Sequence, residues 1–290
     1  ERQCLVERPD WVVVVSDVNS TMACAIAAKK LCISVAHLEA GLRSGDRTMP
    51  EEINRIVTDA IADLLWTPSP DADANLLREG VASDKIERVG NIMIDAFELQ
   101  RTQITACRYA ERLGLQSKHY AVATLHRPVN VDDREALAAL ADQLSRLSSA
   151  LPVVFVAHPR TRHRIEEFGL FDRFGTTQLI APLGYVEFMS LVAEARLVVT
   201  DSGGVQEETS YLGIPCLTVR TTTERPITIS EGTNQLIATA DIHTAAANII
   251  AGRWHRYGPP ALWDGQAAMR VAASLRTRLP PTVHRRSGIA

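Results

Sequence analysis

Acidic side chains follow apolar segments in the first part of the sequence, at positions where a proton could be taken up or returned. Asp17 follows one segment, Glu39 follows the next, and Glu51 and Glu52 precede a helical pattern. Carboxylates are common general acids and bases. Each one here also has a structural explanation, as a turn former, an ion-pair partner or a residue that stabilises the positive end of a helix. We predict functional roles for Asp17, Glu39 and one of the two adjacent glutamates, with Glu51 preferred.

A second group of residues has the character of an anion site. His126 and Arg127 end an apolar segment, where a histidine beside an arginine is suited to a phosphate. His158 ends a later segment in the same way, but a purely structural histidine explains it better. Arg225 lies in the segment RTTTERP, whose two arginines and three threonines follow another apolar run. An anion site explains this segment better than a solvated loop does.

The strongest local motif is TDSGGVQEE, which occupies residues 200–208. In it Ser202, Gly203 and Gly204 join an apolar run to a helical pattern, and residues this small let backbone N–H groups approach a phosphate at the positive end of a helix. An ordinary tight turn would look similar. A following carboxylate such as Glu208 can accept both hydroxyls of a ribose, although acids also favour the helix dipole. The motif therefore predicts a site for a diphosphate and a ribose.

Several other chemistries lack their motifs. The sequence has no Walker A lysine motif, no G-x-G-x-x-G after a strand and no H-E-x-x-H. ATP hydrolysis, a nicotinamide cofactor and a metal site are thus disfavoured, and we expect no cofactor and no metal.

Composition further limits the class of protein to which the chain can belong. The chain has 290 residues, of which 46% are hydrophobic, and a net charge of −3, so it can bury a full core and has no basic excess for nucleic acid. No apolar run is long enough to cross a bilayer, and we expect no membrane partner. The five cysteines are scattered and odd in number. We interpret them as reduced core residues, Cys24 and Cys216 included, which favours the cytoplasm.

The elements that must position these residues alternate along the chain. Unbroken apolar runs without polar alternation predict parallel strands with both sheet faces covered. The helical patterns between them predict a doubly wound α/β architecture, in which ligands lie beyond the carboxyl ends of the strands. The predicted strands are 11–15, 34–38, 121–125, 153–157, 179–181, 197–200 and 216–219. The predicted helices lie near 20–31, 51–63, 70–79, 133–148, 186–195, 204–212, 241–251 and 265–279, and the stretch 95–116 is also helical in pattern.

These motifs together resemble the non-hydrolysing UDP-N-acetylglucosamine 2-epimerases. The resemblance rests on HLEAGLRS at 37–44, PEEINR at 50–55, DSGGVQEE at 201–208 and TERP at 223–226, and it covers nearly all of residues 9–275. It implies two Rossmann-like domains facing a cleft in a glycosyltransferase-B-like fold, usually as a homodimer. It also implies interconversion of UDP-N-acetylglucosamine and UDP-N-acetylmannosamine without a redox cofactor, by elimination of UDP to a 2-acetamidoglucal and re-addition.

The resemblance also implies roles for individual residues. Asp17, Glu39 and Glu51 match the acidic catalytic positions of the family, and His126 matches its histidine near the diphosphate. Which carboxylate takes the C2 proton stays open. For the nucleotide the resemblance implies phosphate contacts from Ser202, Gly203, Gly204 and Arg225, ribose contacts from Glu208 and uracil contacts from Phe188. A core aromatic explains Phe188 about as well.

Three features differ from the family pattern. The strand and the Gly-Thr-Arg-Pro-Glu loop with which the family begins are missing, so we expect an incomplete first sheet with an exposed edge. The usual His-Arg-Arg-Glu-Asn reads HRPVN at 126–130, which puts activation by substrate in question, and Ser16 replaces a glycine. We expect residues 1–96 and 264–280 to form the domain that carries the carboxylates, and residues 97–263 to form the UDP-binding domain.

Other functions fit part of the pattern. A hydrolysing 2-epimerase would share the fold and most site residues but release UDP and free N-acetylmannosamine. A non-catalytic nucleotide-sugar-binding fragment would bind UDP without turnover. A retaining glycosyltransferase of the same fold leaves the set of carboxylates unexplained.

Overall fold

The computed structural model describes residues 1–254 and 258–279. The chain divides into two compact units, one formed by Glu1–Asp95 with the chain from Leu262 onward, the other by Ala96–Ala261. Each unit is built on its own parallel sheet. The two-sheet α/β architecture predicted from the sequence is confirmed.

The sheet of the first unit has the strand order β1-β2-β3-β4, with all described pairs parallel. Its strands are β1 (Trp11–Val15), β2 (Ser34–Leu38), β3 (Leu64–Thr67) and β4 (Ile86–Arg88). The helices of this unit are α1 (Arg2–Glu7), α2 (Asn19–Lys30), α3 (Pro50–Ile61), α4 (Pro70–Arg78) and, from the far end of the chain, α14 (Ala267–Arg278).

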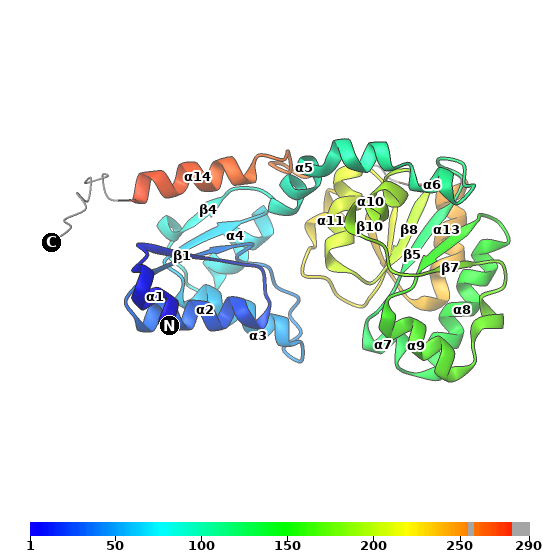
Figure 1. Ribbon diagram of the computed structural model, residues 1–290, viewed down its shortest axis with the longest axis horizontal. Helices are drawn as coiled ribbons and strands as arrows, with labels where there is room; N and C mark the ends of the chain where they lie inside the picture. The colour runs from blue at the N-terminus through cyan, green and yellow to red at the C-terminus, as the bar shows by residue number, and fades with distance from the viewer. Residues whose placement is uncertain (255–257, 280–290) are drawn as a thin grey trace. The chain divides into compact units, whose positions relative to one another are not determined.

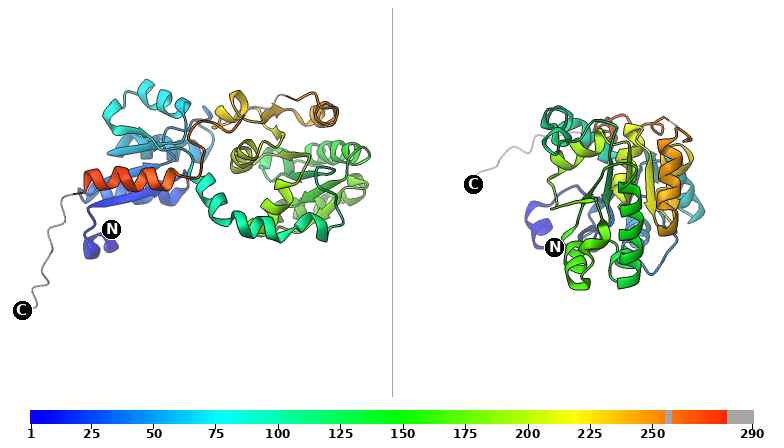
Figure 2. Two further views of the ribbon diagram at one scale, coloured as in Figure 1. Left: turned by 90° about the horizontal axis from the view of Figure 1, so that it is seen from above. Right: turned by 90° about the vertical axis from the view of Figure 1, so that its right-hand side faces the viewer.

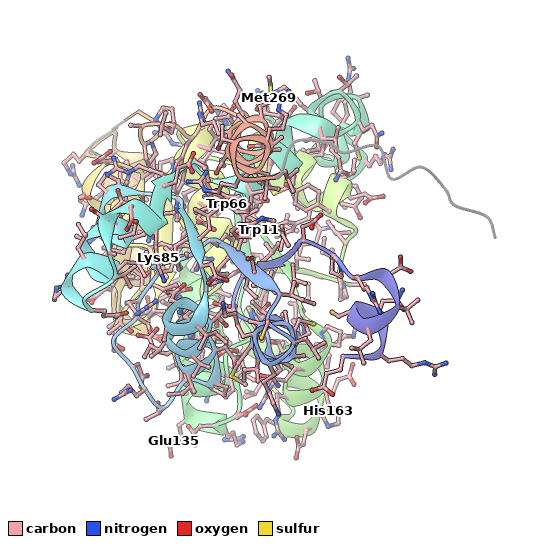
Figure 3. The ribbon with its side chains drawn as sticks, turned by 90° about the vertical axis from the view of Figure 1, so that its left-hand side faces the viewer. Trp11, Trp66, Lys85, Glu135, His163 and Met269 are labelled. Atoms are coloured by element: carbon pink, nitrogen blue, oxygen red, sulfur yellow. The ribbon has the colours of Figure 1, made fainter. Side chains whose placement is uncertain are left out.

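Helix α14 covers one face of this sheet, as Figures 1 and 2 show. Val271 and Leu275 pack against a buried cluster that contains Trp66, whose indole N–H donates to Ser274 Oγ at 2.9 Å. Met269 is 71% exposed and lies on the outer side of the helix. Figure 3 labels this residue together with Trp11 and Trp66. At the β1 edge the cover is incomplete, because Val13 and Val15 remain 43% and 44% exposed.

The sheet of the second unit has the order β10-β9-β8-β5-β6-β7 and is also parallel. Its strands are β5 (Ala121–Thr124), β6 (Val153–Val156), β7 (Gln178–Ile180), β8 (Leu197–Thr200), β9 (Cys216–Val219) and β10 (Asn234–Ile237). Its helices are α5 (Ile92–Cys107, which begins in the first unit), α6 (Tyr109–Arg112), α7 (Pro128–Val131), α8 (Arg134–Ser148), α9 (Pro159–Phe168), α10 (Tyr185–Ala193), α11 (Gly203–Leu212), α12 (Ile227–Ser230) and α13 (Ile242–Ile250).

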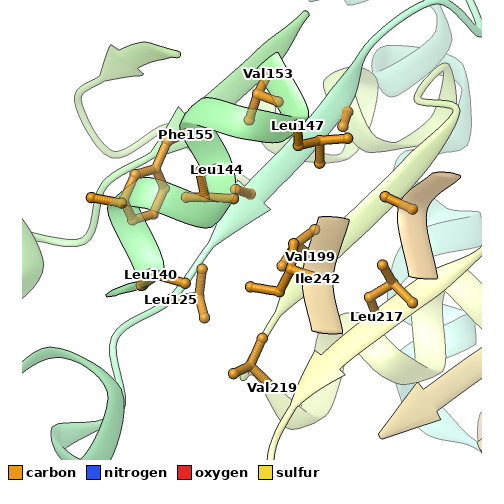
Figure 4. Packing of buried hydrophobic residues seen from close by; sticks show 14 of the residues in the cluster. Leu125, Leu140, Leu144, Leu147, Val153, Phe155, Val199, Leu217, Val219 and Ile242 are labelled. Atoms are coloured by element: carbon orange, nitrogen blue, oxygen red, sulfur yellow. The ribbon is translucent and has the colours of Figure 1, made fainter. Parts of the chain in front are cut away.

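Both faces of the second sheet are buried, which explains why its strands are continuous apolar runs. Ala121 and Ala123 point to a cluster shared with α8 and α13, seen from close by in Figure 4, while Val122 points to the opposite cluster with α10. The carboxyl ends of β5, β8 and β9 consequently lie side by side at one edge of a rigid core.

The predicted elements are confirmed with small shifts at their ends, whereas the strands β3, β4 and β10 and the helices α1, α7, α9 and α12 were not predicted. The interpretation of the cysteines as core residues is wrong for Cys24 and Cys32, which are exposed, whereas Cys216 is buried as expected and Cys4 and Cys107 are half-buried. All five cysteines are free. Across the part of the chain that the structure describes, every helix is too short or too polar to span a membrane.

Candidate active site

Asp17 and Glu39 follow the carboxyl ends of two paired strands. Val15 of β1 is in register with Leu38 of β2, so the loops after these strands start at the same edge of the sheet. The backbone φ angle is 64° at Ser16 and 70° at Glu39, in the left-handed region that side chains other than glycine seldom adopt. Such backbone persists only where the surroundings hold it, and it is concentrated at functional sites.

Asp59 of α3 holds both of these loops. One carboxylate oxygen lies 2.6 Å from His37 Nδ1, and the other accepts from the Gly41 N–H at 3.0 Å and from Arg43 Nη1 at 2.7 Å. His37 Nε2 lies 2.9 Å from the carbonyl oxygen of Ser16. Both ring nitrogens of His37 thus lie within hydrogen-bond distance of oxygen atoms. A single buried carboxylate thereby links the loop of Asp17 to the loop of Glu39.

The electrostatic environment of Asp59 favours its ionised form. Burial alone would raise its pKa, but hydrogen bonds and charge from His37 and Arg43 outweigh burial and lower it. Arg43 also pairs with Glu79 at 2.6 Å, so it is engaged by these two acids rather than by Glu39.

Asp17 is held by a second buried cation. Arg55, whose side chain is only 2% exposed, pairs with Asp17 and with Glu52, the latter at 2.8 Å. Glu52 also accepts the N–H groups of Ser44 and Gly45, each at 2.9 Å. The Glu52 carboxylate is therefore engaged by Arg55 and by the backbone N–H groups of residues 44–45, and it fixes that loop.

Glu51 differs from Glu52 in its surroundings. It is exposed at the start of α3, next to the buried glutamate. The preference for Glu51 over Glu52 stays a prediction.

In the second unit, Asp201 organises the loop after β5. This buried carboxylate accepts the backbone N–H groups of His126 and Arg127 and the Asn130 side-chain amide, at 2.9 to 3.1 Å. It also lies 3.0 Å from His126 Nδ1. Burial would raise the pKa of Asp201, but the His126 and Asn130 hydrogen bonds lower it overall. The His126 imidazole is 41% exposed, so its Nε2 edge can meet a ligand.

Gly203 begins α11 against a cluster of charges. A Cβ at this position would lie 2.6 Å from Glu224 Oε1 and 2.7 Å from Arg225 Nη1, which explains the need for glycine. Arg225 pairs with Glu224 and lies 2.7 Å from Glu207, and Arg220 lies 2.7 Å from Glu224. Burial would raise the pKa of Glu224, but the two arginines outweigh it and lower the pKa to about 2.

Glu208, one turn further along α11, is paired with no cation of the described part of the chain. It is 4% exposed, and the phenol of Tyr185 donates to its Oε1 at 2.8 Å. Burial raises the pKa of Glu208 to about 7, and the Tyr185 hydrogen bond only partly offsets this. Phe188 is half-buried and packs against the core cluster on the α10 face, so both explanations given for it stand.

The structure thus gathers the predicted residues into two groups, one in each unit. Asp17 and Glu39 lie in the loops after β1 and β2, and Glu51 lies in the first turn of α3. The second group is His126, Arg127, Ser202, Gly203, Gly204, Glu208 and Arg225 at the carboxyl ends of β5, β8 and β9, with Phe188 on α10. Within the described ranges, no three His, Cys, Asp or Glu side chains are grouped to hold a metal ion.

Sequence reasoning missed the residues that hold these groups in place. The only trace of Arg55 and Asp59 in the sequence is a helical face made of polar residues, because they follow Glu52 by three and seven positions. Such a face is more typical of a solvent-facing helix than of buried ion pairs. Tyr185 carries no comparable signal in the sequence.

Comparison with known proteins gives consistent matches. The family model described as UDP-N-acetylglucosamine 2-epimerase matches residues 1–276. The UDP-N-acetylglucosamine 2-epimerase of Methanocaldococcus jannaschii is 45% identical over 246 residues, which are 82% of this chain and 67% of that protein. The UDP-2,3-diacetamido-2,3-dideoxy-D-glucuronate 2-epimerase of Pseudomonas aeruginosa is 40% identical over 276 residues, 93% of this chain and 76% of that protein.

A solved structure matches at the level of the fold as well. The crystal structure of the Methanocaldococcus jannaschii UDP-GlcNAc 2-epimerase in complex with UDP-GlcNAc and UDP aligns with a TM-score of 0.84 and 40% identity. The alignment covers 95% of this chain and 78% of that one.

Proposed function

The chain belongs to the UDP-N-acetylglucosamine 2-epimerase family, and from this premise we propose that it interconverts UDP-N-acetylglucosamine and UDP-N-acetylmannosamine. The observation that carries the proposal is the pairing of β1 with β2, which brings the loops of Asp17 and Glu39 to one sheet edge. Two carboxylates from neighbouring loops, held by buried partners, suit a reaction that removes and returns a proton.

The carboxylates of the first unit would move the proton at C2. Elimination of UDP requires a base for that proton while the C1–oxygen bond breaks, and re-addition returns a proton to the opposite face. Asp17, Glu39 and Glu51 are the proposed acid and base groups, each contributing on the order of 10²–10⁴ in rate. The ion pair of Asp17 with Arg55 supports a fixed orientation of that carboxylate.

The second unit would hold UDP as substrate and as leaving group. The N–H groups at the start of α11, at Ser202, Gly203 and Gly204, are proposed to bind the diphosphate. His126, fixed through Nδ1 by Asp201, leaves Nε2 to stabilise the charge that develops on the diphosphate. Arg127 and Arg225 would add positive charge there.

The rest of the nucleotide would be held by two further side chains of the second unit. Glu208 would bind the ribose and Phe188 the uracil.

We also propose that the protein works as a homodimer in the cytoplasm. Five free cysteines support a reducing compartment. The dimer rests on the family resemblance and is tested by light scattering of the purified protein.

The direct test is proton NMR of UDP-N-acetylglucosamine with the protein in heavy water. The manno epimer carrying deuterium at C2 supports the proposal, since solvent deuterium enters only if the C2 proton leaves. Free N-acetylmannosamine with UDP would instead identify a hydrolysing enzyme. UDP binding without any change in the sugar would identify a binding protein.

A second sugar is worth the same experiment. The Pseudomonas relative named for UDP-2,3-diacetamido-2,3-dideoxy-D-glucuronate aligns with 93% of this chain, a larger share than the 82% of the archaeal relative. Supplying each nucleotide sugar in turn and comparing kcat/KM decides which sugar the enzyme prefers.

A further inference from the structure

The environment of Glu208 is unlike that of its charged neighbours. Glu207 and Glu224 both have arginine partners, whereas within residues 1–254 and 258–279 Glu208 has only the neutral phenol of Tyr185 as its partner. A buried carboxylate with one neutral hydrogen bond is costly to ionise, which is the physical cause of its raised pKa. Further hydrogen-bond donors would stabilise such a carboxylate, and a ligand can supply them.

Tyr185 occupies one side of this carboxylate. It is the first residue of α10, and its hydroxyl lies 2.8 Å from Glu208 Oε1. Burial and the neighbouring Glu208 raise the pKa of the phenol, so it keeps its proton and donates. Among the described residues, no hydrogen bond is found at the second oxygen, Oε2.

Resting on the proposed function, we infer that Tyr185 is a positioning residue for Glu208 and sets the preference for ribose over 2′-deoxyribose. A carboxylate offers about four acceptor directions, of which the phenol takes one and a vicinal diol needs two. By fixing the plane of the carboxylate, Tyr185 holds the remaining acceptors toward both ribose hydroxyls. A nucleotide that lacks the 2′-hydroxyl then leaves a buried acceptor unpaired, which costs affinity.

The test measures affinity for two ligands that differ by one hydroxyl. Isothermal titration gives Kd for UDP and for dUDP with the wild-type chain, Tyr185→Phe and Glu208→Gln. For the wild type we expect UDP to bind about tenfold or more tightly than dUDP, the value of one lost hydrogen bond to a charged group. Tyr185→Phe should reduce that ratio to about threefold or less, because the carboxylate loses the hydrogen bond that orients it.

Helix α11, which carries Glu208, also provides a matched control. Tyr211 of α11 donates to Glu98 Oε1 at 2.5 Å, and neither residue is among those proposed to bind the nucleotide. Tyr211→Phe therefore removes a phenol–carboxylate hydrogen bond of the same kind and should leave the UDP to dUDP ratio unchanged. A general loosening of the unit would change both variants alike.

The possible outcomes separate the inference from the proposed function. A wild-type chain that prefers UDP while Tyr185→Phe keeps the full ratio overturns the role of Tyr185 and leaves the epimerase proposal intact. Equal affinity of the wild type for UDP and dUDP also overturns it. If UDP does not bind and no epimer forms, the proposed function fails as well. A reduced ratio in Tyr185→Phe alone supports the inference.

Discussion

Replacing Asp59 by asparagine tests whether one buried carboxylate holds the two acidic loops. The substitution keeps the shape of the side chain and removes its charge. It leaves His37 and Arg43 facing a neutral amide in a place where the Asp59 side chain is only 1% exposed. The Gly41 N–H also loses its ionised acceptor.

The magnitude follows from this geometry. Removing one partner of a buried ion pair costs about 3–5 kcal/mol, because the other charge stays buried without compensation. Arg43 keeps its contact with Glu79, and the asparagine oxygen can still accept one hydrogen bond. We therefore expect the lower end, about 3 kcal/mol of the free energy of unfolding of the first unit.

Urea denaturation followed by tryptophan fluorescence is the assay. Trp11, Trp66 and Trp263 belong to the first unit, so the signal reports mainly on it. With a slope of about 2 kcal/mol per molar urea, the midpoint should fall by roughly 1–1.5 M. Epimerase activity should fall too, since the loops of Asp17 and Glu39 lose their common anchor.

Asp63→Asn is the matched control. Asp63 pairs with Lys29 at 2.7 Å, but both side chains are 33% exposed, so the expected cost is about 1 kcal/mol or less. If Asp59→Asn costs no more than Asp63→Asn, the anchoring role assigned to Asp59 is wrong.

The pH dependence gives a second check on Asp59. Because its pKa is lowered in the folded protein, its contribution is present above the pKa of an unfolded aspartate, about 3.9. That contribution is lost as the pH falls through the lowered folded value. The difference in stability between wild type and Asp59→Asn should thus be largest near neutrality and shrink in acid.

Three further predictions concern single positions. Gly203→Ala should weaken UDP binding at least about tenfold, as measured by titration, because the new Cβ would lie 2.6 Å from Glu224 and 2.7 Å from Arg225. An unchanged affinity would contradict the importance of this close approach between residue 203 and the two charged side chains. Ser16→Val should lower the unfolding free energy by about 1–2 kcal/mol while Ser16→Gly is tolerated, since φ is 64°; equal effects in urea titrations would rule out backbone strain. UDP affinity should increase from pH 6 to pH 8, roughly one unit either side of the Glu208 pKa of about 7, as the ionised carboxylate accepts the ribose hydroxyls. Glu208→Gln should flatten that dependence.

The sequence predicts the strands well where burial on both faces makes them apolar. Trp11–Val15 and Leu197–Thr200 are continuous apolar runs and form β1 and β8 as expected. In contrast, β4 is the three-residue segment Ile86–Arg88 and β10 begins with Asn234 and Gln235, so neither has an apolar signature. Their pairing depends on neighbours far away in the sequence.

The residues of the candidate site also differ in whether the sequence alone reveals them. Asp17 and Glu39 are detectable because they follow strands, and strand ends in parallel sheets are where ligands bind. Asp59 was missed because its role depends on His37, 22 residues earlier in the sequence, which only the fold brings within 2.6 Å. An aspartate on a helix with polar neighbours reads from sequence as a solvent-facing residue.

Each unit places its candidate residues with the same physical device. A buried aspartate accepts backbone N–H groups from a loop and contacts a histidine, as Asp59 does with Gly41 and His37 and Asp201 does with Arg127 and His126. A carboxylate buried in this way has lost its hydration, so loss of its hydrogen-bond donors would destabilise the fold by the full desolvation penalty. Because the loop supplies these donors, it has few alternative conformations. The side chains expected to touch the substrate are therefore oriented by residues that need not touch it, and loss of either aspartate should impair the site without removing any group that contacts a ligand.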